Sequence, residues 1–362
     1  MRILHLDLGG VWRGGQQQAY YLHRHLLHLG EDSVLLAPEG SPLLLRCRKE
    51  GLRAHSFRGG VARHPCALLA VREAAGGQKV LLHAHDAKAV FAGALAKLCG
   101  IAGILVAHRR VAYPLGANPL ARWKNGAADG WVAVSQEVAA MLARGIPPGR
   151  TVAVVHSALD LAAFRDEALE ADLAALRREL SLPGDAPVVG LLGAFSHQKG
   201  HATLLEAAPA ILSRFPTAIF LLAGEGPLRA GIAAKAKLMG ISDNFRFPGF
   251  RADGAALTSL MTVAVVPSID GEGSSASIKE PMALGVPVVV SELAGNIEVG
   301  GDAVKTFPVG DAAALAAALT LFLEDAGERE KSACRGVERS PRFSVEAMGG
   351  GVLDLYKRVG FR

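Results

Sequence analysis

Cysteine is scarce in this chain of 362 residues, and its four copies, Cys47, Cys66, Cys99 and Cys334, stand far apart. No Cys-x-x-Cys pair occurs, so neither a disulfide framework nor a cysteine-based metal site is expected. Unpaired thiols suit a reducing compartment. We therefore expect a protein of the cytoplasm.

Long apolar runs are also missing. No uncharged apolar stretch reaches the roughly 18 residues that a membrane-spanning helix needs. The chain begins MRILHLDLGG, where the apolar run is too short and too interrupted for a signal peptide. We expect neither a membrane span nor a signal peptide, and any membrane contact would be peripheral, at the inner face of the membrane.

Aromatic residues make up only 6% of the chain, and no zinc-finger spacing or aromatic RNA-binding motif accompanies the basic residues. Nucleic acid is therefore excluded as a partner. The net charge of +5 is unevenly placed, because residues 1–165 carry 20 Lys and Arg against 10 Asp and Glu, and the remainder carries 19 against 24. The basic first half favours an acidic substrate or an anionic membrane surface, with ordinary solubilising charge as the alternative.

Short apolar runs alternate with helical patterns along the whole chain. Most runs are continuous rather than alternating, which is typical of parallel strands covered on both faces by helices. They are residues 2–8, 33–38, 79–85, 103–108 and 130–135 in the first half, and 188–195, 218–224, 245–250, 263–268 and 286–291 in the second. The pattern predicts an α/β chain of two Rossmann-like domains, residues 1–165 and 166–343, with parallel sheets facing each other across a cleft.

Glycine-rich loops follow strands in the second half, at 193–200, 224–231, 249–254 and 271–277. Ligands of open parallel sheets bind beyond the carboxyl ends of the strands, where glycines such as Gly224 let the backbone come close to a ligand. Lys199 and Arg229 lie in two of these loops and could clamp a diphosphate. We therefore expect an anionic, nucleotide-like ligand.

Other phosphate and metal motifs do not fit. GEGPLRAG (224–231) nearly matches the dinucleotide fingerprint, but Arg229 stands at the third glycine, so a dehydrogenase is weakly supported. GAFSHQKG (193–200) lacks the spacing and the Lys-Ser/Thr ending of an NTPase phosphate loop. Neither Asp-x-Asp nor His-Glu-x-x-His occurs, so we expect no metal.

The stretch GEGSSASIKEPMALG (271–285) places two glutamates, Glu272 and Glu280, eight positions apart. A helix that starts there would offer free N–H groups and a positive dipole end to a phosphate. The hydroxyls of Ser274, Ser275 and Ser277 could cap that helix.

Pro281 bears on where that helix begins. Proline lacks an N–H and suits only the first turn of a helix. We therefore expect the helix to begin late, with Glu280 in its first turn and residues 274–279 as an extended phosphate-binding segment.

Several of these motifs resemble the family-4 retaining glycosyltransferases of the GT-B fold. The resemblance rests on GAFSHQKG, AGEGPLR and FPGF, and above all on EGSSASIKE followed by PMALGVPVVVSELAGNIE, which contains the family's Glu-x7-Glu pair and its Gly-x-Pro-Val-Val. It covers most of the chain, and its C-terminal motifs are more specific than those of the first half. It implies an acceptor-binding first domain, a donor-binding second domain, and a C-terminal helix, 344–362, that packs back on the first.

The resemblance also implies roles for single residues. Lys199 would contact the diphosphate of a nucleotide-sugar donor, Glu272 would face the donor sugar, and Glu280 would accept hydrogen bonds from the ribose. Around them, the residues that would bind the donor are Gly14 and Gly15 of the first domain's glycine loop, together with Gly224, Arg229, Gly273, Ser274, Ser275, Ala276 and Ser277. The donor is a substrate, and no cofactor or metal is implied.

One residue departs from the family pattern. The family often has an arginine where Ala194 stands, so diphosphate binding would rest on Lys199 with help from neighbouring basic residues.

The basic first domain would bind the acceptor. His85, Asp86, His108, Arg109 and Arg110 follow two of its strands, and His108 is the first choice for a sugar or acceptor contact, because the family often has a histidine there. A structural or surface role is the alternative for each histidine. His83 and His85 could bind metal, but the sequence indicates no third ligand.

Two further groups of residues in the first domain have expected roles. We expect His23, His25 and His28 to form a solvated helix face. Arg109, Arg110, Arg122, Trp123 and Lys124 combine charge with an aromatic ring and would suit peripheral contact with anionic lipid.

The expected function is metal-independent transfer of a sugar, with retention, from a nucleotide-diphosphate sugar to a glycan or lipid-linked acceptor, in cell-surface polysaccharide or lipopolysaccharide synthesis. A sugar-nucleotide epimerase of the same fold and a non-catalytic nucleotide-sugar-binding subunit are the alternatives.

Overall fold

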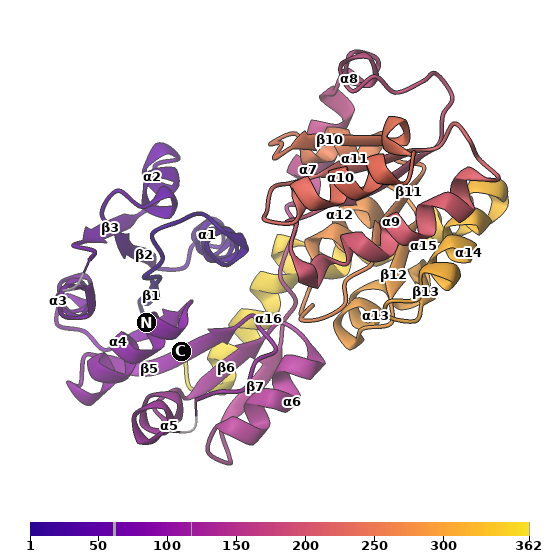
Figure 1. Cartoon of the computed structure of the whole chain (residues 1–362). Helices are drawn as coiled ribbons and strands as arrows, with labels where there is room; N and C mark the ends of the chain where they lie inside the picture. The colour runs from indigo at the N-terminus through magenta and orange to yellow at the C-terminus, as the bar shows by residue number, and fades with distance from the viewer. Residues whose placement is uncertain (61–62, 117, 362) are drawn as a thin grey trace. The chain divides into compact units, whose positions relative to one another are not determined.

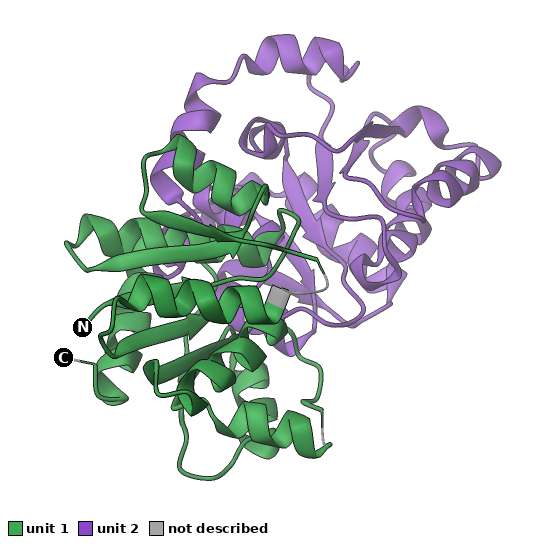
Figure 2. Cartoon of the chain, turned by 90° about the vertical axis from the view of Figure 1, so that its left-hand side faces the viewer, with its two compact units in different colours: residues 1–158, 345–362 green, residues 159–344 purple. Residues whose placement is uncertain are grey.

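The computed structural model describes residues 1–60, 63–116 and 118–361. The chain forms two compact units, Met1–Ala158 with Val345–Arg362 (unit 1) and Leu159–Ser344 (unit 2), which Figure 2 shows in different colours. The expected boundary after residue 165 falls inside helix α7 (Leu161–Glu170). That helix belongs to unit 2, where the Arg165 guanidinium donates to the Ala283 carbonyl at 3.1 Å. The chain therefore enters unit 2 before α7 begins.

Among its described residues, unit 1 contains a seven-stranded parallel sheet in the order β3-β2-β1-β4-β5-β6-β7. The strands are β1 (Ile3–Leu6), β2 (Ser33–Pro38), β3 (Ala54–Phe57), β4 (Val80–Ala84), β5 (Ala102–Arg109), β6 (Gly130–Ala133) and β7 (Thr151–Val154). The order reverses between β1 and β4, which lie side by side. The loops after these two strands therefore diverge to opposite faces of the sheet.

Helices cover both faces of this sheet (Figure 1). One face packs on α3, α4 and α6, and the other on α1, α2 and α16. The helices of unit 1 are α1 (Gly14–His28), α2 (Pro42–Lys49), α3 (Arg63–Ala75), α4 (Ala87–Leu98), α5 (Pro119–Gly126), α6 (Gln136–Gly145) and α16 (Val345–Arg358). Helix α16 is the expected C-terminal helix that returns to the first domain. The predicted last residue of that helix, Arg362, lies outside the described residues.

Unit 2, which is described throughout, contains a six-stranded parallel sheet in the order β10-β9-β8-β11-β12-β13. The strands are β8 (Val188–Leu192), β9 (Ile219–Ala223), β10 (Phe245–Gly249), β11 (Val263–Val266), β12 (Val288–Ser291) and β13 (Val304–Phe307). The order reverses between β8 and β11. Alternate residues of each strand enter two separate cores, one on each face of the sheet.

Helices also cover both faces of the unit 2 sheet. Helices α8, α11, α12 and α13 line one core, and α9, α10 and α14 line the other. The helices are α7 (Leu161–Glu170), α8 (Leu173–Glu179), α9 (His201–Leu212), α10 (Arg229–Leu238), α11 (Gly254–Ser259), α12 (Ala276–Ala283), α13 (Ala294–Gly300), α14 (Ala312–Glu324) and α15 (Ala326–Arg339). The two helix-covered parallel sheets confirm the predicted pair of Rossmann-like units.

Three strands escaped the sequence prediction, and all three are four-residue strands at sheet edges. They are β3 and β7 in unit 1 and β13 in unit 2. Each is partly exposed, and β3 and β13 also lack the continuous apolar run that marks an inner strand, whereas β7 does contain a short apolar run, at 152–155. Within the described residues, the helices all fall short of the length and apolar character that crossing a bilayer would need.

A substitution at Gly130 on β6 tests the packing of α16 on the unit 1 sheet. A Cβ atom at this position would lie 2.9 Å from Val359 Cγ1 and 3.2 Å from Leu355 Cδ1, both contributed by the C-terminal segment. Gly130→Val should therefore lower the free energy of unfolding by about 1–3 kcal/mol through overpacking. Urea denaturation measures this change.

Gly10 provides the matched control, because a Cβ at that position meets no atom within 4 Å. Gly10→Val should leave the denaturation midpoint close to that of the parent protein. Equal midpoints for Gly130→Val and Gly10→Val would contradict the described packing of α16.

Candidate functional site

The best-formed polar site in unit 2 lies where the strand order reverses, between β8 and β11. The loop after β8 carries Lys199, and the loop after β11 carries Glu272. Neighbouring parallel strands end at the same edge of a sheet, so these two loops meet there. Two side chains 73 positions apart in sequence are thereby brought together.

Lys199 and Glu272 form a close ion pair, with Lys199 Nζ 2.5 Å from Glu272 Oε1. The Lys199 side chain is 21% exposed and the Glu272 side chain only 7%. Ser268, which is fully buried, donates its hydroxyl to the same carboxylate oxygen at 2.7 Å. The carboxylate is thus held from two sides, while the ammonium group remains reachable from solvent.

Two glycines explain how the backbone reaches this arrangement. Gly224 has φ of +141°, and a Cβ there would lie 2.0 Å from the Gly193 carbonyl oxygen. A Cβ on Gly295 of α13 would lie 1.9 Å from the carbonyl oxygen of Glu272. A side chain at Gly224 would displace the loop that carries Lys199, and one at Gly295 would displace the loop that carries Glu272. The Gly224 position is therefore accounted for by close backbone packing.

Helix α12 begins earlier than the sequence prediction placed it. It starts at Ala276, so Pro281 lies inside the helix and Glu280 lies in its second turn, and the predicted extended segment 274–279 is wrong. The helix tolerates the proline because its ring removes only one N–H donor and is buried in the core of unit 2. The first-turn N–H groups still point out of the helix at residues 276–278.

The three serines at this helix start do not cap it as predicted. Ser275 occupies the N-cap position but its hydroxyl makes no capping bond and is buried without a partner. Ser277 instead donates to the Leu192 carbonyl at 2.8 Å, which ties α12 to the end of β8. Ser274 accepts from the Lys279 ammonium at 2.6 Å. Gly273, which is buried, leads into this segment.

Lys279 has a role that the sequence analysis did not assign. Its side chain is buried, its ammonium group also donates to the Ser274 carbonyl at 3.0 Å, and it lies 5.2 Å from the centre of the Phe343 ring. Burial lowers the pKa of Lys279 to about 7. Lys279 therefore stabilises the loop at Ser274. In the sequence, the one hint of this role was its position between the predicted ligand-binding residues Ser277 and Glu280.

Glu280 lies on the same helix and is half-buried. Burial raises the pKa of its carboxyl to about 6, against the opposing effects of Lys279 and Lys199. Together with Ser277 it lines a small cavity between α12 and the end of β8. A carboxyl with this pKa is ionised at neutral pH and can accept hydrogen bonds.

Arg229 is the first residue of α10 and is tied to β10. Its guanidinium donates to the Phe247 carbonyl at 2.7 Å, and its Nε is buried without a partner. The proposed diphosphate contact of Arg229 stays a prediction.

In unit 1 the predicted glycine loop is shorter than expected, because Gly14 and Gly15 are the first two residues of α1. Gly15 faces Arg110, whose side chain would lie 3.9 Å from an added Cβ. Arg110 is half-buried: its guanidinium donates to the His85 carbonyl at 2.6 Å, and burial lowers its pKa to about 10. Its guanidinium is thus engaged within the unit, and the predicted lipid contact of Arg110 stays a prediction.

Arg110 also sets the protonation of two histidines. It donates to Nδ1 of His85 at 3.1 Å and to Nδ1 of His108 at 3.3 Å. Burial holds the pKa of both imidazoles well below the usual value, so each ring is neutral and carries its single proton on Nε2. His85 then donates to Nδ1 of His5 at 2.9 Å.

The structure supplies the third histidine that the sequence analysis did not find. His5, His83 and His85 are buried and offer ring nitrogens within 4.8 Å of one another. Both nitrogens of His85 are engaged, however, and the Arg110 cation beside it opposes a second cation. The cluster as it stands does not suit a metal ion.

Other predictions for unit 1 have mixed outcomes. His23 is fully buried and bonded to the Ser33 hydroxyl at 2.7 Å, so the predicted solvated face of α1 is wrong at that position. Asp86 caps α4 by accepting from the Lys88 and Ala89 N–H groups. On α5, Arg122 and Trp123 are exposed, as peripheral contact with a membrane would require.

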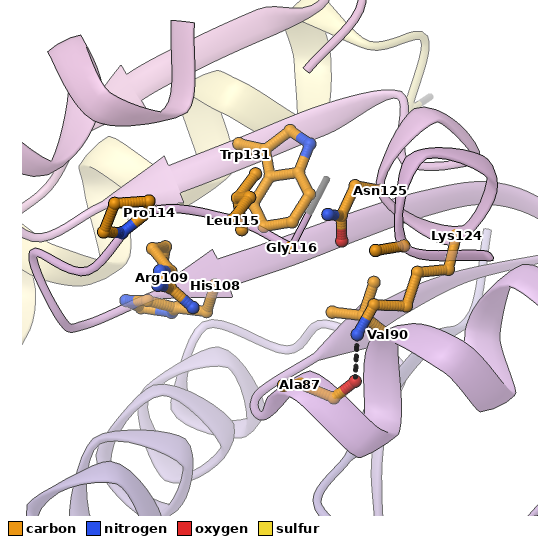
Figure 3. A pocket seen from close by; sticks show the side chains of 11 residues that line it. Ala87, Val90, His108, Arg109, Pro114, Leu115, Gly116, Lys124, Asn125 and Trp131 are labelled. Carbon is orange, nitrogen blue, oxygen red and sulfur yellow. Dashed lines mark hydrogen bonds between the residues drawn. The ribbon is translucent and has the colours of Figure 1, made fainter. Parts of the chain in front are cut away.

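A cavity of about 220 Å³ lies in unit 1 beside His108 (Figure 3). It is bounded by the start of α4, the end of β5, helix α5 and Trp131 of β6. Arg109, Lys124 and Asn125 also line it. Arg109 and Lys124 were among the predicted ligand-contacting residues, whereas no motif in the sequence marks Asn125.

A second cavity, of about 350 Å³, shares Ala87, Ala121 and Lys124 with the first. Phe91 and Leu120 give it an apolar lining. The start of α4 and the face of α5 therefore border both a polar and an apolar space.

Each half of the chain matches a known glycosyltransferase family. Residues 12–163 match the family described as Glycosyltransferase Family 4, and residues 186–325 match the one described as Glycosyl transferases group 1. The chain is similar to a 2-deoxystreptamine glucosyltransferase of Streptomyces kanamyceticus, with 28% identity over 69% of this chain and 65% of that protein.

Two other relatives have names that refer to lipids or lipopolysaccharide. A phosphatidyl-myo-inositol mannosyltransferase of Mycolicibacterium smegmatis is 33% identical over 49% of this chain and 46% of its own. A lipopolysaccharide core biosynthesis glycosyltransferase of Rhizobium meliloti is 32% identical over 49% of this chain and 52% of its own. The matched regions span between about half and two thirds of these relatives.

Solved structures share the fold over nearly the whole chain. A glycosyltransferase from Rickettsia africae has a TM-score of 0.84 at 18% identity, covering 99% of this chain and 98% of its own. Anabaena HepE in complex with UDP-glucose has a TM-score of 0.80 at 19% identity, covering 99% of this chain and 100% of its own. The two family matches and the shared fold lead to one conclusion: the chain belongs to the group 1, family-4 type glycosyltransferases of the GT-B fold.

Proposed function

We propose that the protein is a retaining glycosyltransferase that moves a sugar from a nucleoside diphosphate sugar to a glycan or lipid-linked acceptor. The Lys199–Glu272 pair at the reversal point of the unit 2 sheet carries this proposal. A cation and a carboxylate side by side match the two charges that sugar transfer from a diphosphate develops. The complex of Anabaena HepE with UDP-glucose supports the same class of donor.

The reaction breaks the bond between the anomeric carbon and a phosphate oxygen. The leaving diphosphate gains negative charge, which Lys199, the Ser275 hydroxyl and the first-turn N–H groups of α12 would stabilise. The sugar gains positive charge at its anomeric carbon, as in glycoside hydrolysis, and Glu272 would stabilise it. Because the Ser268 hydroxyl bonds to the Glu272 carboxylate, the negative charge is already held in position before the donor binds. No protein nucleophile is assigned.

Glu280 would bind the ribose of the donor. Its carboxyl lies on α12, one helical turn beyond the residues that would hold the phosphate. A ribose offers two hydroxyl donors, and an ionised carboxylate accepts both.

The acceptor and pathway follow from the relatives rather than from the site. Relatives named for phosphatidyl-myo-inositol and for the lipopolysaccharide core support a lipid-linked or glycan acceptor in cell-surface polysaccharide or lipopolysaccharide synthesis. We infer that the protein acts in the cytoplasm at the inner face of the membrane, where the exposed Arg122 and Trp123 of α5 would meet anionic lipid.

Two alternative functions, epimerase and binding subunit, would use the same donor site. The products formed from the donor distinguish them from a transferase. An epimerase would convert the donor sugar without an acceptor, and a binding subunit would leave it intact. A thermal-shift screen of UDP-, GDP- and ADP-sugars identifies the donor. Chromatography of that donor after incubation then shows slow release of the free sugar for a transferase, an epimeric donor for an epimerase, or unchanged donor for a binding subunit.

Replacing Glu272 should separate catalysis from binding. Glu272→Gln keeps the shape and the Ser268 contact but removes the charge, so kcat for donor hydrolysis should fall about 10²–10³-fold with a smaller change in donor affinity. Glu206→Gln, an exposed glutamate on α9, is the matched control and should keep the parent rate. Equal rates for Glu272→Gln and Glu206→Gln would rule out the proposed role.

Donor binding should depend on pH through Glu280. Its pKa of about 6 lies above the ordinary value of 4.5, so the carboxyl is protonated below pH 6 and loses its capacity to accept both ribose hydroxyls. Donor affinity should therefore rise with pH between about 5 and 7 and then level off. Calorimetric titration with the donor over this range measures the effect. In Glu280→Gln the rise should disappear, and a persisting rise would assign it to another group.

A further inference from the structure

The cavity of unit 1 contains buried hydrogen-bond donors that none of the described residues satisfies. His108 and Asn125 are 6% and 3% exposed, and both line the cavity. Within the described part of the chain, neither His108 Nε2 nor Asn125 Nδ2 has a hydrogen-bond partner. Since Arg110 donates to His108 Nδ1, the neutral ring carries its proton on Nε2, which makes this atom a donor. Leaving a buried donor unpaired costs about 1–3 kcal/mol.

The lining of the cavity is rich in donors and cations. Figure 3 shows the Asn125 amide directed between the Trp131 ring and the Lys124 side chain, with Arg109 and His108 on the facing side. Lys124 donates to the Ala87 carbonyl at 3.3 Å, which leaves its ammonium group further donors. Burial lowers the pKa of Lys124, the nearby Arg109 charge lowers it further, and the Asp86 carboxylate opposes them. An anion between them would relieve this repulsion.

The lining residues restrict the chemistry of a ligand. None of the described lining residues is Asp, Glu, Ser, Thr or Tyr, and the Asn125 carbonyl is the one side-chain oxygen among them. A neutral sugar would bring hydroxyl protons that find few acceptors there. A phosphate brings only acceptors and charge. The cavity is smaller than the roughly 300–1,000 Å³ of typical ligand sites, so it suits one group of a larger molecule.

We propose that this cavity binds a phosphate ester group of the acceptor, through His108, Asn125, Lys124 and Arg109. The proposal rests on the proposed glycosyltransferase function, in which unit 1 binds the acceptor. The same chemistry is offered by the headgroup of a phospholipid and by a soluble sugar or polyol phosphate. His108 and Asn125 would each donate to a phosphate oxygen, while the two cations balance its charge.

Calorimetric titration of the full chain with glycerol 3-phosphate, without donor, tests the site. Asn125→Asp turns the donor into a carboxylate of the same shape and should weaken binding about tenfold or more. Lys124→Gln should also weaken it, and this half-exposed residue guards against misfolding of the Asn125 variant. Gln78→Glu, an exposed amide-to-carboxylate exchange in the same unit, should bind like the parent.

A second variant distinguishes this cavity from the donor site. Lys199→Gln should keep glycerol 3-phosphate binding, because Lys199 belongs to unit 2. Loss of binding in Lys199→Gln but not in Asn125→Asp would overturn the proposal, as would absence of binding by the parent protein in both this titration and the vesicle assay below. Since no donor is present, the titration is informative even for a protein that transfers no sugar, and donor hydrolysis tests the proposed function separately.

Vesicle sedimentation identifies the source of the phosphate. The probes are vesicles of phosphatidylcholine alone and of phosphatidylcholine with phosphatidic acid. Binding to the phosphatidic acid vesicles that Asn125→Asp weakens supports a lipid headgroup. Binding of glycerol 3-phosphate without such vesicle binding supports a soluble phosphate ester. Vesicle binding that is equal in the parent and Asn125→Asp, with no soluble binding, overturns the site.

Discussion

The ion pair between Lys199 and Glu272 is the interaction in unit 2 that most requires compensation for lost hydration. A carboxylate that is only 7% exposed loses most of its hydration, which costs several kcal/mol unless opposite charge and hydrogen bonds replace it. The ammonium of Lys199 and the hydroxyl of Ser268 supply that replacement. Both lie near the carboxylate only because β8 and β11 are neighbours in the sheet. Close backbone packing at Gly224 and Gly295 supports one loop each, and Ser277 ties the start of α12 to the end of β8.

Unit 1 holds a cation, Arg110, against two neutral imidazoles. The rings of His85 and His108 accept its N–H groups, and the charges of Asp7 and Asp86 oppose the lowering of its pKa by burial. Burial keeps the rings neutral, so they satisfy the guanidinium without adding repulsion. Each ring then accepts at Nδ1 and carries its proton on Nε2, so His108 Nε2 is a hydrogen-bond donor. The half-buried Arg110 thus determines which ring nitrogen of His108 is left as a donor to a ligand.

Sequence patterns predicted those parts of the molecule that depend on local chemistry. Inner strands such as β4 and β11 are continuous apolar runs, and the motif residues Lys199 and Glu272 do lie together. The start of α12 was predicted wrongly from Pro281. Whether a helix can contain a proline depends on how the surrounding residues pack, and the sequence does not show this packing. His5 and Asn125 carry no motif. Their environment arises from strands and helices that are distant in sequence, so only the three-dimensional structure reveals it.

Helix α16 has a consequence for how the protein comes to be folded. Unit 2 is one continuous segment, whereas unit 1 is made of two segments that flank it. The crossing segments are joined by a hydrogen bond from Leu159 N–H to the Phe343 carbonyl, of 2.8 Å. During synthesis on the ribosome, unit 2 can fold as soon as it emerges. The part of the first sheet's face that α16 covers stays exposed to solvent until residues 345–358 are made, although α1 and α2 already cover the rest.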